Sequence, residues 1–120
     1  MNRFHRAARL DELPLGRGKF VLVAGIPVAL FRLEEGLFAL DNRCPHAGAP
    51  LSRGQVCQGV VTCPLHQWHF RLADGQHLDQ PASGRHAICY PVCLVGDEVH
   101  VSVPDSDPLA EAEERDLSSP

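Results

Sequence analysis

Two short stretches decide the nature of this 120-residue chain: CPHAGAPL at residues 44–51 and CPLHQW at residues 63–68. Each stretch holds one cysteine and one histidine, separated by one residue in the first and by two in the second. Neither stretch is typical of a strand, because proline lacks a backbone donor and occurs in both. A cysteine and a histidine this close in a tight loop can reach one metal centre, and both suit iron or zinc. The candidate ligands are Cys44, His46, Cys63 and His66.

Two kinds of metal centre compete for these four side chains. Structural zinc sites use Cys2His2 sets, but they usually place like ligands together, as C-x2–4-C and H-x3–5-H. Here each stretch mixes one Cys with one His, which suits a [2Fe–2S] centre with both Cys on one iron and both His on the other. Gly48 permits close approach of the backbone to a bulky inorganic core. A structural zinc-binding module is the alternative.

The rest of the chain predicts an all-β fold. Glycine and proline divide it into short segments rich in Val, Leu and Phe, which is typical of a sandwich or small barrel. In the last segment Val99, Val101 and Val103 alternate with polar residues, so one face should point inward. Hairpin turns are expected at residues 74–75 and 96–97. The expected strands are residues 19–24, 27–33, 37–41, 59–62, 68–72, 76–78, 87–95 and 98–103, and the expected helices are residues 6–12 and 109–116.

Charge divides the chain into two parts. The net charge is −4, and residues 104–120 hold six carboxylates against one arginine. We therefore predict a domain over residues 1–103 and an acidic, flexible tail over residues 104–120. We also expect that deleting residues 106–120 leaves the metal centre intact. A near-neutral body without clustered Lys or Arg predicts no nucleic-acid partner.

The composition also bears on location and chemistry. No apolar run approaches the roughly 20 residues of a membrane span, and the first ten residues lack the apolar core of a secretory signal. We therefore predict a cytoplasmic protein without a membrane partner. The sequence contains no Gly-rich phosphate loop, no G-x-S-x-G motif and no paired carboxylates in a motif, which argues against nucleophilic or hydrolytic catalysis. The remaining classes are an electron carrier, a redox subunit without a complete active site of its own, and a structural zinc module.

The remaining cysteines and aromatic residues receive structural interpretations. Five cysteines are an odd number, which argues against a disulfide scaffold. Cys57 is expected as a small apolar residue on a hairpin. Cys89 and Cys93 lie four residues apart on a predicted strand, so both should pack on one face. His69 is expected to be half-exposed on a strand, and Trp68 to shield the metal centre from water.

The sequence CPHAGAPLSRG…VTCPLHQW resembles the two cluster-binding loops of the Rieske family. The resemblance spans about residues 10–103 and implies stacked antiparallel sheets with a small subdomain, formed by two loops, that presents the cluster at one tip. It implies that Cys44 and Cys63 hold the inner iron. It also implies that His46 and His66 hold the outer iron near solvent, where electrons leave.

Departures from the family pattern refine this expectation. Ala49 and Leu65 stand where respiratory Rieske proteins carry a disulfide, so that bridge cannot form. Gln67 and Trp68 follow the last ligand, where those proteins place a serine that donates to a cluster sulfur. Fewer donors should lower the reduction potential. We expect a value in the lower part of the Rieske range of about −150 to +300 mV.

The loop CPLHQW also bears on the partner. Ferredoxin components of ring-hydroxylating dioxygenases often carry Trp where Leu65 stands, whereas the form here resembles the small subunit of assimilatory NAD(P)H nitrite reductase. This resemblance implies a redox subunit beside a large subunit that binds flavin and sirohaem. The alternative is a stand-alone ferredoxin that passes electrons from a flavoprotein reductase to an oxygenase.

Overall fold

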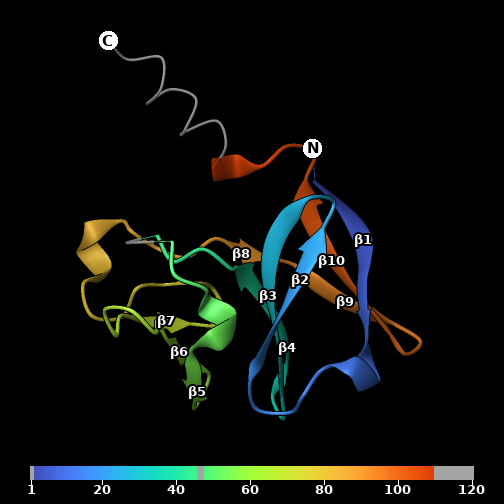
Figure 1. Cartoon of the computed structure of the whole chain (residues 1–120), viewed down its shortest axis with the longest axis horizontal. Helices are drawn as coiled ribbons and strands as arrows, with labels where there is room; N and C mark the ends of the chain where they lie inside the picture. The colour runs from blue at the N-terminus through green and yellow to red at the C-terminus, as the bar shows by residue number, and fades with distance from the viewer. Residues whose placement is uncertain (1, 46–47, 110–120) are drawn as a thin grey trace.

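The computed structural model describes residues 2–45 and 48–109 as three antiparallel sheets (Figure 1). The first sheet has the order β1 (Asn2–Arg9), β10 (Glu98–Pro104), β9 (Val92–Val95). The second has the order β2 (Gly18–Val23), β3 (Ile26–Leu33), β4 (Gly36–Asp41), β8 (Cys89–Tyr90). The third has the order β5 (Gln55–Cys57), β6 (Val60–Thr62), β7 (His69–Arg71). Short 3-10 helices occur at η1 (Leu10–Glu12), η2 (Leu51–Arg53) and η3 (Pro81–Ser83).

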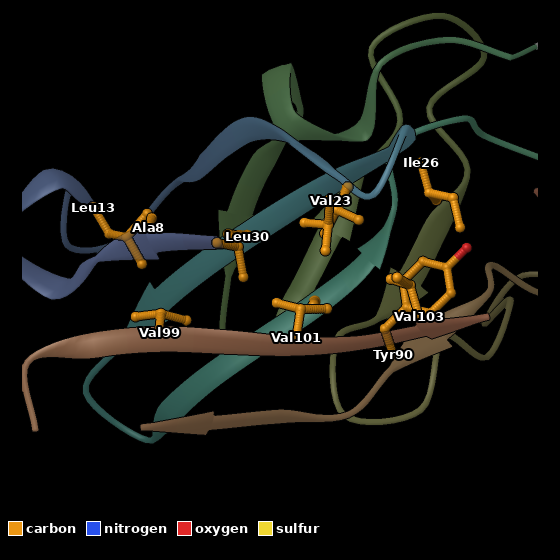
Figure 2. Close-up of a cluster of buried hydrophobic side chains, with 11 residues drawn as sticks. Ala8, Leu13, Val23, Ile26, Leu30, Tyr90, Val99, Val101 and Val103 are labelled. Carbon is orange, nitrogen blue, oxygen red and sulfur yellow. The ribbon is translucent and has the colours of Figure 1, made fainter. Parts of the chain in front are cut away.

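The first two sheets pack against each other around one hydrophobic core. Val99, Val101 and Val103 of β10 point into it, as the alternating pattern predicts, and all three are fully buried. Figure 2 shows these valines facing Leu30 of β3 and Val23 of β2. The core consists of Ala8, Leu13, Val23, Ile26, Val28, Leu30, Ala39, Tyr90, Val99, Val101 and Val103.

Strand β3 also contributes to a second core. Val28 and Leu30 point into the first core, whereas Ala29 and Phe31 point away from it. Successive side chains of a strand face opposite sides of the sheet, so the continuous apolar run of β3 reflects burial on both faces. The second core consists of Ala29, Phe31, Leu40, Cys44, Ala49, Leu51, Val61, Cys63, Phe70, Leu72 and Ala87.

The third sheet and the two Cys-containing loops stand to one side of the first two sheets, as Figure 1 shows. The second core joins this smaller subdomain to β3 and β4. The expected all-β architecture with a small subdomain is therefore confirmed. In the described part of the chain, no helix has the length and apolar character needed to cross a bilayer.

The predicted helix at residues 6–12 is wrong. Residues 2–9 form β1, which pairs with β10 along its length with an irregularity between Arg6 and Ala8, and only η1 follows. Pairing with β10 supplies hydrogen bonds and burial that outweigh a weak helical preference. The second predicted helix, residues 109–116, lies outside the described residues except for Leu109.

The predicted strand at residues 87–95 is in fact two strands in different sheets. Pro91 separates β8, which pairs with β4, from β9, which pairs with β10. The expectation that Cys89 and Cys93 share one face is wrong for this reason. Residues 76–78 form a single bridge between His77 and Phe70 rather than a strand. Strand β6 pairs with β7 on one edge and with β5 on the other, and β5 was not among the expected strands.

Gly54 allows the end of the first Cys-containing loop to approach β6 closely, and β6 leads into the second Cys-containing loop. Its φ of −73° is open to any residue. A Cβ at this position, however, would overlap the carbonyl oxygen of Thr62 and press on the side chain of Val61. A glycine is therefore needed here for space and not for backbone conformation.

We predict that Gly54→Ala lowers the free energy of unfolding by about 1–3 kcal/mol, because β6 must move to admit the methyl group. Denaturant unfolding of the purified protein measures this. Gln55→Ala is the control, since Gln55 is the exposed neighbour of Gly54. A Gly54→Ala protein as stable as the Gln55→Ala protein would show that the two segments do not approach this closely.

Candidate metal centre

The first Cys-containing loop is closed by hydrogen bonds of its own backbone. The N–H of Cys44 donates to the carbonyl of Ala49 at 2.9 Å, and the N–H of Gly48 donates to the carbonyl of Cys44 at 2.7 Å. Gly48 has a φ of +71°, a conformation that glycine adopts without steric cost. The Cys44 side chain is buried, with 3% of its surface exposed. His46 lies outside the described residues.

The second loop repeats this geometry. The N–H of Cys63 donates to the carbonyl of Trp68 at 2.7 Å, and the N–H of Gln67 donates to the carbonyl of Cys63 at 3.1 Å. Gln67 occupies the place of Gly48 and also has a positive φ, +57°. Cys63 is as buried as Cys44, with 1% exposed, whereas His66 lies at the surface.

The two loops are therefore equivalent in backbone structure, although their sequences read C-x-H and C-x-x-H. In each, the cysteine donates to the residue five positions later and accepts from the residue four positions later. Both cysteines belong to the second core. The described part of the site thus has two buried thiols at the base and one imidazole, that of His66, at the surface.

The first loop is also tied to the sheets below it. The N–H of Asn42 donates to the carbonyl of Pro27 at the start of β3, and the carbonyl of Asn42 accepts from Leu51. The Asn42 side-chain oxygen accepts from the N–H of Ser52 at 2.8 Å. One residue thereby connects β3 to both sides of the loop, so the rigid sheet sets the position of Cys44.

The chemistry of the donor set fits an iron–sulfur cluster. Two thiolates in apolar surroundings need a compensating positive charge, which bound iron supplies. Among residues 2–45 and 48–109, no three His, Cys, Asp or Glu side chains gather as ligands of a single ion. A two-iron cluster spreads its ligands over two metal atoms, with His on one and Cys on the other, and needs no such group.

The remaining cysteines lie outside this site. Cys57 and Cys89 are exposed, Cys93 is half-buried, and all are free thiols. Although the residue as a whole is exposed, desolvation of its sulfur beside the carbonyl of Ala73, together with the charge of Asp74, raises the pKa of the Cys89 thiol. The thiol therefore stays protonated and weakly reactive. At the positions of the respiratory disulfide, Ala49 is buried and Leu65 is 56% exposed.

An aromatic stack supports the second loop and was not predicted from the sequence. The ring of Trp68 stacks on that of His77 with centroids 4.1 Å apart and planes 14° apart, and Phe70 packs against both. His77 is 1% exposed, and its Nε2 has no hydrogen-bond partner. This atom lies 3.5 Å from an oxygen of Asp79. His77 therefore acts mainly as a flat packing surface for Trp68.

Asp79 fixes the strand that follows the second loop. Its carboxylate accepts the backbone N–H of His69 at 2.7 Å and lies 3.0 Å from Nδ1 of the same residue. The backbone hydrogen bond from His69, followed by contacts with the His69 ring, lowers the pKa of Asp79. His69 is half-exposed on β7, as predicted.

We predict that His77→Ala lowers the free energy of unfolding by about 2–4 kcal/mol, because it leaves a cavity under Trp68. His77→Phe keeps the stack and removes only two long polar contacts, of Nδ1 with Ser83 and of Nε2 with Asp79, both at 3.5 Å. Its effect should therefore stay below about 1.5 kcal/mol. Denaturant titration followed by tryptophan emission measures both, since Trp68 is the only tryptophan. Equal losses in the two variants would contradict a packing role for His77.

Comparison with known proteins identifies the family of this chain. The model of the Rieske [2Fe–2S] domain matches residues 3–101. The ferredoxin component of the naphthalene 1,2-dioxygenase system of Pseudomonas aeruginosa is 34% identical over 97 residues, covering 81% of this chain and 92% of the relative.

Two solved structures are similar over nearly their whole length. One, named as a candidate NADH-dependent nitrite reductase small subunit from Mycobacterium tuberculosis, has a TM-score of 0.78 and 33% identity, covering 87% of this chain and 97% of the other. The ferredoxin of carbazole 1,9a-dioxygenase from Nocardioides aromaticivorans IC177 has a TM-score of 0.75 and 30% identity, covering 82% of this chain and 95% of the other. The chain thus belongs to the Rieske [2Fe–2S] domain family and is an electron-transfer protein with a Rieske-type [2Fe–2S] cluster.

Proposed function

We propose that Cys44, His46, Cys63 and His66 hold the cluster, with the two cysteines on the inner iron and the two histidines on the outer iron. The main support is the equivalence of the two loops, which present one buried cysteine each from the same hydrogen-bonded turn. The exposed position of His66 suits a ligand of the outer iron. This assignment also accounts for the mixed Cys–His content of each loop.

The residues of the chain give the cluster its environment. When bound, a [2Fe–2S] cluster accepts and releases one electron at a time. Cys44 and Cys63 lie in the apolar second core, which keeps water from the inner ligands. His66 lies at the surface, where a partner protein can approach it. The backbone hydrogen bonds that close each loop restrict the conformations open to Cys44 and Cys63.

The first candidate role is the small redox subunit of an assimilatory NAD(P)H nitrite reductase in the cytoplasm. Two observations support it: the CPLHQW loop and the similarity to the protein named as a nitrite reductase small subunit, with a TM-score of 0.78. In this role the chain relays electrons within an assembly. The large subunit supplies the flavin and sirohaem groups and the nitrite site.

The second candidate role is a free ferredoxin that carries electrons from a flavoprotein reductase to an oxygenase. The 34% identity to the ferredoxin component of a naphthalene 1,2-dioxygenase system favours it. Both roles use the same cluster and the same exposed tip. They differ in whether the chain stays bound to one large partner or exchanges between two.

We predict that the anaerobically purified protein is red-brown and contains about two iron and about two acid-labile sulfide per chain. Cys44→Ser and Cys63→Ser should abolish the visible spectrum or strongly alter it, and His66→Ala should do the same, because each removes a proposed ligand. Iron and sulfide analysis with visible absorption measures this.

Matched controls are available for each residue type. Cys57→Ser removes an exposed free thiol, and His5→Ala removes a histidine of β1, so both variants should keep the parent spectrum. A His66→Ala protein with an unchanged spectrum would refute the ligand assignment. A colourless protein with one zinc per chain would refute the cluster itself.

We predict that a tagged form of the chain, captured from its own host, brings with it a large protein containing flavin and sirohaem. The captured complex should reduce nitrite with NAD(P)H. Isolation of the chain alone, with reduction by a separate flavoprotein and reoxidation by an oxygenase, would contradict the subunit role and support the ferredoxin role.

A further inference from the structure

Arg43, the residue before Cys44, is held between two carboxylates from distant parts of the chain. Its Nε and one Nη donate to the two oxygens of Asp41 at 2.9 and 2.8 Å. Its two Nη atoms donate to the two oxygens of Asp107 at 3.0 and 2.8 Å. Each carboxylate is thus bound in the bidentate manner that the planar guanidinium favours.

The Asp41 side of this arrangement is rigid. Asp41 ends β4 and is 1% exposed. Its carboxylate also accepts the backbone N–H of Arg43 at 3.0 Å and the hydroxyl of Tyr90 at 2.8 Å. Burial, with the nearby charge of Asp41, raises the pKa of Tyr90, so this hydroxyl remains a donor at neutral pH. The second sheet therefore holds Asp41 in place independently of the Arg43 side chain.

Asp107 approaches Arg43 from the other side. It follows β10 by three residues, and its Oδ1 also accepts the backbone N–H of Leu109 at 2.9 Å. The side chains of Arg43 and Asp107 are 24% and 27% exposed, so the pair is largely shielded from solvent. Such a shielded bidentate pair within a network holds its geometry better than an isolated surface pair.

We infer that Asp107 is a positioning residue for the cluster, because it holds Arg43 and, through Arg43, the start of the loop that contains Cys44. The inference rests on the proposed ligand role of Cys44. If Asp107 has this role, the segment Asp107–Leu109 belongs to the cluster-binding unit. The Arg43–Asp107 contact therefore argues against the expectation that residues 106–120 can be removed without effect on the metal centre.

Asp105 offers a control that matches Asp107 in charge and lies two residues away. Its carboxylate lies 3.6 Å from Nε of Arg3 on β1, in an exposed pair. Replacing Asp105 or Asp107 by Ala removes one negative charge from the same segment. Only the change at Asp107 removes the contact with Arg43.

The test compares full-length proteins purified anaerobically with the cluster bound. Each is exposed to an iron chelator, and the decay of visible absorbance gives the rate of cluster loss. We expect Asp107→Ala to lose the cluster about tenfold faster than the parent, a magnitude typical of residues that support metal ligands. Asp105→Ala should lose the cluster at the parent rate. Asp107→Glu keeps the carboxylate, so its rate of cluster loss should lie close to that of the parent.

A second measurement separates positioning from general destabilisation. In an Arg43→Ala background the further change Asp107→Ala should have little additional effect on cluster loss, because its contact is already gone. The visible circular dichroism of the bound cluster should change in Asp107→Ala and not in Asp105→Ala. Far-ultraviolet circular dichroism checks that the sheets of each variant remain folded.

Two results would overturn the inference. One is an equal rate of cluster loss in Asp107→Ala and Asp105→Ala. The other is that Asp107→Ala speeds cluster loss in the Arg43→Ala protein as much as it does in the parent. Failure of the ligand assignment has a different signature. In that case Cys44→Ser retains the parent spectrum, whatever happens at Asp107.

Discussion

Strand β3 must satisfy two hydrophobic cores at once, and the cluster-binding subdomain depends on this. Val28 and Leu30 complete the core between the first two sheets, while Ala29 and Phe31 complete the core that contains Cys44 and Cys63. A one-residue slip of β3 would exchange the two faces and disrupt both cores. The larger sheets therefore set the position and orientation of the smaller subdomain.

The two loops on that subdomain are shaped largely by their own backbone. Each turns back on its cysteine through the same pair of hydrogen bonds, and both cysteines are buried in the second core. The positive φ of Gln67 has a steric cost of about 1–2 kcal/mol that Gly48 avoids. The burial of Cys63 and the stacking of the half-buried Trp68 on His77 offset this cost, and a bound cluster would further stabilise the folded form.

Polar and aromatic residues from outside the loops complete the site. His77 provides a surface for Trp68, Asp79 holds β7, and Arg43 joins the end of β4 to the segment after β10. His77 and Asp79 show no recognisable spacing relative to Cys44 or Cys63, and nothing in the sequence indicates that Arg43, which directly precedes Cys44, pairs with Asp107. Their roles follow from contacts between segments up to 64 positions apart, which local patterns do not encode.

The sequence by itself determined the all-β class, the inward face of β10 and the four candidate ligands, because strand alternation, turn residues and ligand spacing are local properties. Only the tertiary structure decided that residues 2–9 form a strand and that Pro91 divides residues 87–95 between two sheets, since pairing with distant strands overrides weak local preference. It also decided the burial of His77 and the placement of Asp107 beside Arg43. Packing and charge pairing between distant segments become visible only when the chain is folded.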